Sequence, residues 1–242
     1  MCLYVFLRQN HVGLTMQYNS NDGVSLKYSQ AINRTAFIRN TYLWLMCGFG
    51  IAAIGAINSQ YIAIAMLQSF GRASIWVLFI AQFGSLIWAK AVSRSKPLNK
   101  YAYIAFTFIC GVIAGIIITS VQQAGSDIAL VSFCMTATIF LLLSAIAVFS
   151  CKDFSFLQNF VIIGIGVMVL GSLLTTIFNI ETFDIIIASV AVITCSAKIL
   201  WDTSTMLRTE DYSDSAGFAL TLFVGLYNIF ISLIRILGGP RD

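Results

Sequence analysis

Residues 129–149 read ALVSFCMTATIFLLLSAIAVF, a stretch without one charged side chain. A helix needs about 20 apolar residues to cross the hydrocarbon core of a membrane, so this stretch is long enough to span it. A transmembrane barrel would instead show segments of alternating polarity, about ten residues long. Residues 129–149 and the stretch IIIASVAVITCSA at 185–197 are continuously apolar. The sequence therefore predicts transmembrane helices.

The composition extends this prediction to the whole chain. Of the 242 residues, 59% are hydrophobic and 10% are charged, and the mean hydropathy is +0.88. A soluble domain carries roughly 25% charged residues. We predict an all-α integral membrane protein whose membrane domain, residues 41–242, is a bundle of seven transmembrane helices in the lipid bilayer. The predicted spans are 41–66, 74–92, 101–121, 128–149, 157–178, 183–207 and 216–238.

The basic residues predict the orientation of the bundle, because cytoplasmic loops of membrane proteins are enriched in Lys and Arg. With the N-terminus in the cytoplasm, ten basic residues lie on the inner side and two on the outer side. An odd number of spans then puts the C-terminus in the periplasm. The inner residues are Arg8, Lys27, Arg34, Arg39, Lys90, Arg94, Lys96, Lys100, Lys152 and Arg208, and the outer ones are Arg72 and Arg241.

Residues 1–40 are expected to form a flexible cytoplasmic tail, because residues 17–40 are mostly polar. The apolar opening MCLYVFL is too short for a signal peptide and lacks a basic leader. Met16 begins an ordinary polar tail, so either Met1 or Met16 could be the true start.

The sequence offers little chemistry for an enzyme. His11 is the only histidine, so a Ser–His dyad inside the membrane and a His-Glu-x-x-His zinc site are excluded. We expect no catalytic residues, no metal site and no cofactor. The net charge of +4 follows from the membrane topology and needs no nucleic-acid partner. The cysteines form no Cys-x-x-Cys pair and are interpreted as small core residues: Cys2, Cys47, Cys110, Cys134, Cys151 and Cys195.

Two ionisable residues lie inside one predicted span, where charge is costly and often functional. Lys198 and Asp202 are four residues apart, so they share a helix face and can pair. A structural ion pair and a functional site are equally open interpretations.

Other polar or small residues in the spans have simpler interpretations. Arg235 should extend to the outer interface, too far from Asp202 to pair with it. Tyr227 and Asn228 lie mid-helix, where an amide needs a partner on another helix. Gly111 and Gly115 have the spacing that permits close helix contact, which we expect within the bundle rather than in a dimer.

Four segments resemble the Bax inhibitor family, and most closely its bacterial YccA-like branch. They are IRNTYLWL at 38–45, KDFSFL at 152–157, ILWDTSTM at 199–206 and LTLFVGLYNIFISLIRILGGPRD at 220–242. The resemblance implies a seven-helix protein of the bacterial inner membrane that binds and modulates FtsH, a membrane-anchored AAA+ zinc protease, as a slow substrate and inhibitor.

The resemblance also implies a competing function, the calcium leak ascribed to other family members. That activity is tied to two acidic residues, one in each of the last two helices. The first position matches Asp202, but the second is Gly225 in this chain. This departure weakens the case for a proton-gated calcium path, and the sequence favours the protease modulator over the cation channel.

Overall fold

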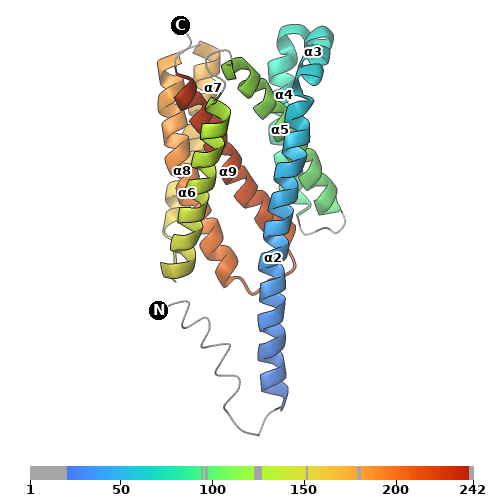
Figure 1. The fold of residues 1–242 in the computed structure, drawn as a ribbon, viewed down its shortest axis with the longest axis vertical. Coiled ribbons are helices and arrows are strands. Elements are labelled where there is room, and N and C mark those ends of the chain that lie inside the picture. Colours follow the sequence, from blue (N-terminus) through green and yellow to red (C-terminus); the bar gives the residue numbers. More distant parts are fainter. Residues whose placement is uncertain are drawn as a thin grey trace.

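The computed structural model describes residues 21–93, 95, 98–122, 127–150, 152–178 and 181–239. Within these residues the regular structure is entirely helical (Figure 1). In the labels of Figure 1, the helices are α2 (Asn21–Ile57), α3 (Ser59–Phe70), η2 (Gly71–Ala73), α4 (Ser74–Ala91), α5 (Leu98–Gln122), α6 (Ile128–Ser150), α7 (Leu157–Phe178), α8 (Glu181–Arg208) and α9 (Ser215–Gly238).

Seven of these helices are long and apolar enough to cross a membrane, which confirms the predicted fold class. Six of the seven predicted spans agree with α4 to α9 within about three residues at either end. Side chains that face lipid are apolar, and this continuous apolarity identified the spans. The spans are helical because in lipid each backbone N–H and C=O must bond within its own helix.

The first span is the exception. We predicted it at 41–66, but the membrane-length part of α2 is Ile32–Ile57, and α3 is a separate short helix. Asn58 stands at the break, with its side-chain amide donating to the carbonyl of Ile54 at 2.8 Å. The predicted start was too late because Arg34 and Arg39 were assigned to the tail.

Part of the predicted flexible tail is also helical, since α2 begins at Asn21 and continues without interruption through residue 40. Phe37 is 2% exposed and packs into the core. The predicted boundary between tail and membrane domain at residue 40 therefore does not coincide with an end of α2. The two candidate start residues, Met1 and Met16, lie outside the described residues.

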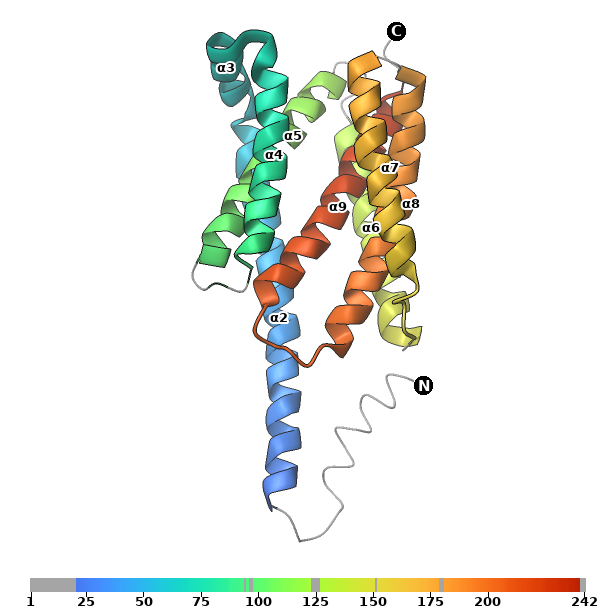
Figure 2. The ribbon, with the colours of Figure 1, turned by 180° about the vertical axis from the view of Figure 1, so that it is seen from behind.

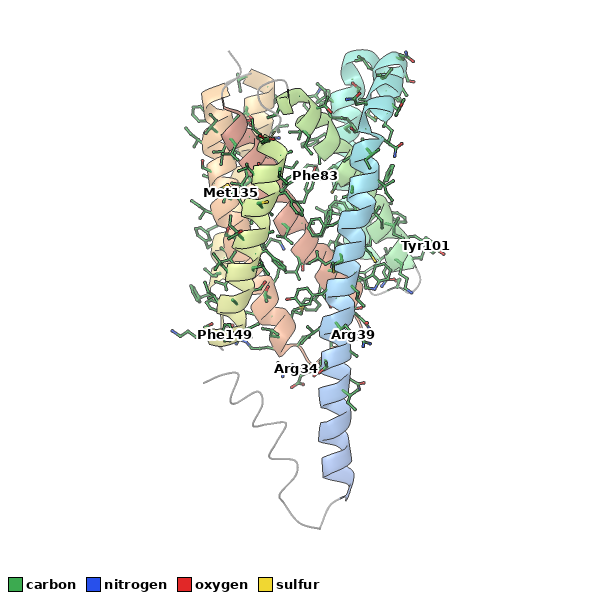
Figure 3. All side chains as sticks on the ribbon, in the orientation of Figure 1. Arg34, Arg39, Phe83, Tyr101, Met135 and Phe149 are labelled. Atoms are coloured by element: carbon green, nitrogen blue, oxygen red, sulfur yellow. The ribbon has the colours of Figure 1, made fainter. Side chains whose placement is uncertain are left out.

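Helix α9 occupies the middle of the bundle. In its most apolar window 72% of the residues are buried, against 6% in α4. Figure 2 shows α9 crossing diagonally between α4 on one side and α7 and α8 on the other. The peripheral helices turn large apolar side chains outward, as expected in lipid. Figure 3 shows this for Tyr101 and Phe149, which are 64% and 62% exposed.

The basic side chains gather at one end of the bundle, here called the basic end. It holds the start of α2, the end of α4 and the loops after α6 and α8. Arg34 and Arg39 lie there on α2 (Figure 3), and Lys90 and Arg208 stand in the last turns of their helices. This asymmetry agrees with the distribution used to predict orientation, and the direction of insertion stays a prediction.

Gly111 and Gly115 bring α5 against α2. A Cβ atom on Gly111 would lie 2.0 Å from the carbonyl oxygen of Ala52, and one on Gly115 would lie 2.5 Å from that of Ala56. Backbone at such distances has no room for a methyl group. The close contact is therefore made inside the bundle.

We expect Gly111→Ala to destabilise the bundle by about 2 kcal/mol, because overpacking against backbone costs ~1–3 kcal/mol. The change should lower the midpoint of thermal unfolding of the purified protein in detergent. Gly84→Ala on α4 is the matched control, since nothing lies within 4 Å of its Cβ position. Equal midpoints for the two variants would contradict the close α2–α5 contact.

Candidate functional site

Lys198 and Asp202 form an ion pair in the half of α8 that is nearer the basic end. Their side chains are 12% and 11% exposed. The Lys198 ammonium also donates to the backbone carbonyl of Thr221 on α9 at 3.0 Å. Lys198 thus links α8 to α9, and the ion pair spans one turn of α8. Burying either charge alone would be costly, and the pairing offsets much of that cost.

Gly225 lies one turn beyond Thr221 on α9 and faces α8. A Cβ atom there would lie 2.9 Å from Cγ1 of Ile199 and 3.8 Å from the carbonyl oxygen of Cys195. This position, where the family resemblance expects a second carboxylate, is filled by close helix packing. In this chain the nearest charged partner of Asp202 is therefore Lys198.

A cavity of about 1120 Å³ lies between α4 and α5 on one side and α7 and α8 on the other, with α9 as its inner wall. Most of the side chains that line it are apolar. Lys198 lines the cavity, whereas Asp202 does not. The ammonium group therefore stands between the buried carboxylate and the open space.

Three further polar side chains line the cavity at mid-depth: Gln82, Tyr227 and Asn228. The Asn228 amide donates to the carbonyl of Val224 on its own helix at 2.8 Å. The sequence analysis expected a partner on another helix, but the hydrogen bond that this amide donates stays within α9. Gln82 donates weakly to the sulfur of Cys110 at 3.4 Å, and its carbonyl oxygen is buried without a hydrogen bond to any described residue.

Arg235 is held by a residue that the sequence analysis did not pair with it. Its guanidinium lies 3.1 Å from the carboxylate of Asp184, near the start of α8. Both side chains are about one third exposed. The pair joins the ends of α8 and α9 that lie away from the basic end, as the Lys198 pair joins the parts nearer to that end. Arg235 also lines the cavity, away from the basic end.

A second cluster lies in the loop that carries the KDFSFL segment. Arg208 forms a salt bridge with Asp153 at 3.0 Å and donates to the carbonyl of Lys152, so the end of α8 holds the loop between α6 and α7. The pKa of the Asp153 carboxyl lies below its ordinary value, chiefly because Ser155 donates to it from its hydroxyl and backbone N–H, with Arg208 adding a smaller effect.

Sequence reasoning found the Lys198–Asp202 pair and missed the cavity. Gln82 and Lys90 are the two side chains that could have indicated it. Both lie in a helix that is otherwise almost wholly apolar, and a spacing of eight residues puts them on one face. The pairing of Asp184 with Arg235 could not be read from spacing, since the two residues are 51 apart.

Ion pairs at two depths, a central buried helix and seven membrane-length helices define a multi-pass α-helical membrane protein. Among the described residues, no group of three or more His, Cys, Asp or Glu side chains could hold a metal ion. The four described cysteines are free thiols: Cys47, Cys110, Cys134 and Cys195.

The family follows from comparison with known sequences. Residues 34–242 match the model of the family described as inhibitor of apoptosis-promoting Bax1, so the chain belongs to the Bax inhibitor family. It is 32% identical over 206 residues to an uncharacterised protein of Campylobacter jejuni, covering 83% of this chain and 87% of the relative.

A functionally named relative is the modulator of FtsH protease YccA of Escherichia coli K12. The identity is 29% over 226 residues, which cover 93% of this chain and 97% of the relative. The same protein in another E. coli strain is named an inner membrane protein. A membrane protein of Vibrio cholerae is 26% identical over 207 residues, covering 83% of this chain and 88% of that relative. Together with the seven spans, these relatives identify a multi-pass inner-membrane protein.

We expect Lys198→Met to destabilise the bundle by about 3 kcal/mol, because removing one partner of a buried pair leaves an uncompensated charge. Asp202→Asn should cost less, since Lys198 keeps the Thr221 carbonyl and faces the cavity. The double variant Lys198→Met/Asp202→Asn should recover part of the loss. Thermal unfolding in detergent measures all three, with exposed Lys152→Met as the control. A double variant less stable than Lys198→Met alone would contradict the pair.

Proposed function

We propose that this protein binds and modulates the FtsH protease, acting as a slow substrate that restrains degradation of other membrane proteins. The observation that carries the proposal is the similarity to the E. coli FtsH modulator, which extends over nearly the full length of both chains. No cofactor and no catalytic role are proposed. The described residues offer binding surfaces and a stable bundle, which are what a modulator needs.

The first helix supports this proposal by its shape. Helix α2 extends well beyond the other helices at the basic end (Figures 1 and 2). With the N-terminus in the cytoplasm and the C-terminus in the periplasm, as the basic residues predict, this extension lies on the cytoplasmic side. A projecting chain end is easier for a protease to grip than a packed helix.

The contacts of α2 offer a reason for slow degradation. Arg34 donates to the carbonyl of Leu207 at the end of α8. Phe37 packs against the rings of Tyr212 and Phe218, with centroids 5.7 Å and 5.6 Å away. A pull on α2 therefore acts on the α8–α9 connection and on the enclosed α9. Extraction must break this packing before the first span can leave the membrane.

Deleting residues 1–33 should lengthen the lifetime of the protein in cells several-fold while leaving it inserted, because the grip is removed and Arg34 and Phe37 are kept. Pulse-chase labelling with and without FtsH gives the lifetime. Deleting residues 240–242 at the opposite end is the control and should change nothing. Degradation of the 1–33 deletion at the original rate would locate the grip elsewhere.

Crosslinking in the native membrane tests binding directly. A photoreactive residue at position 33, exposed on α2, should capture FtsH, and one at exposed Tyr101 on α5 should capture it much less. If neither position captures FtsH while the protease is active in the same membranes, the proposed partner is wrong.

A cation leak is the competing function, and the cavity gives it one point of support, because it reaches deep into the bundle. Its charges oppose it. The charged side chains among the described lining residues are Lys90, Lys198 and Arg235, all basic. Lys198 and Arg235 are paired with carboxylates that do not line the cavity, so the described lining offers no carboxylate to a cation. Calcium is therefore not proposed as a ligand.

We expect little proton-gated calcium flux from the unmodified protein in liposomes. Gly225→Asp should raise the flux and make it depend on pH between ~5 and 8, since it restores the second carboxylate of the family pair at a buried position where ionisation is costly. Gly225→Asn is the matched control without the charge. Strong pH-gated flux from the unmodified chain, abolished by Asp202→Asn, would overturn the modulator and establish the channel.

A further inference from the structure

The cavity opens sideways, toward the space that lipid occupies around a membrane protein. Several of its lining side chains are also exposed apolar residues, including Ile75 and Ile87 on α4, at 64% and 67%, and Val169 on α7, at 37%. From Ile75 to Lys90, the lining face of α4 extends for about 22 Å at 1.5 Å per residue. The cavity is thus a long apolar groove between α4 and α7 that reaches most of the way across the hydrocarbon core.

The charges of the groove have one sign. Lys198 is neutralised by Asp202 and Arg235 by Asp184. Lys90 is exposed in the last turn of α4 and has no salt bridge to any residue that the structure describes. The charges that act on it at longer range are those of Lys198, Asp202 and Asp214. At the basic end the groove therefore offers a lysine without a salt-bridged carboxylate among the described residues.

The shape and the charge of the groove indicate its occupant. Its volume is about 1120 Å³, and Lys90 stands at one end of an otherwise largely apolar face of α4. A phospholipid offers the matching parts, an anionic phosphate and a thin, flexible acyl chain. Aromatic and branched side chains such as Phe79, Phe83 and Leu86 give it an apolar wall on α4.

We propose that the groove is a binding site for an anionic phospholipid of the leaflet at the basic end. Its phosphate pairs with Lys90, and its acyl chains lie along α4 between that helix and α7. Lys198 lies deeper and has three N–H donors, two of which bond to Asp202 and Thr221. The third is available to an ester oxygen. This site rests on the cavity and on Lys90, and it is independent of any action on FtsH.

Native mass spectrometry of the full-length protein in neutral detergent tests the headgroup. The protein is titrated with dioleoyl-phosphatidylglycerol or with dioleoyl-phosphatidylcholine, which has the same acyl chains and no net charge. We expect phosphatidylglycerol to bind at least about fivefold more tightly, a ratio of roughly 1 kcal/mol, as for one Lys at a membrane surface. Lys90→Gln should abolish this preference, and Lys152→Gln, an exposed residue with the same charge change, should keep it.

A second pair of variants tests the position of the acyl chains. Val169→Trp fills the groove and should reduce binding of both lipids, whereas Val167→Trp, on the same helix but outside the cavity lining, should not. Equal binding of the two headgroups, or equal effects of Lys90→Gln and Lys152→Gln, would overturn the preference for an anionic phospholipid at Lys90. Binding unaffected by Val169→Trp would overturn the groove as the site. A protein dimer that Val169→Trp dissociates would assign the groove to a second copy.

Discussion

The fold depends on one helix being enclosed by protein instead of lipid. Helix α9 is surrounded by α2, α5, α6 and α8, and its side chains form much of the core. Phe223 is the centre of this packing, with ring contacts to Phe49, Tyr103, Phe106 and Tyr227. In lipid there is no hydrophobic drive between helices, so dense packing and polar links must hold an enclosed helix. The Lys198 and Arg235 pairs supply such links at two depths of α8 and α9.

The cavity follows from the path of α9. Because this helix crosses the bundle diagonally, it separates α4 on one side from α7 on the other (Figure 2). Only 6% of the most apolar window of α4 is buried. Membrane proteins can keep such a space without the penalty of exposing apolar surface to water, because lipid can fill it.

Continuous apolarity identified six spans, since the length of a helix in lipid is fixed by the bilayer. The prediction of the first span was wrong because charged residues were taken as its boundary. In the structure Arg34 donates to a carbonyl at the end of α8, and α2 begins at Asn21. The Lys198–Asp202 pair could be predicted because both partners lie on one helix. The link to Thr221, the Asp184–Arg235 pair and the cavity depend on how distant helices meet, and a single sequence does not record that.

The phospholipid site and the modulator function would be linked through the free energy needed to extract this protein from the membrane. A ligand that binds only the folded bundle stabilises it in proportion to the logarithm of its concentration over its dissociation constant. A membrane lipid is present at high local concentration, so even weak binding would link α4 to α7 across the groove. The least buried helix would then be the one whose release depends most on lipid composition. A protease that pulls on α2 would meet a bundle whose resistance is set jointly by the packing of α9 and by the lipid between α4 and α7.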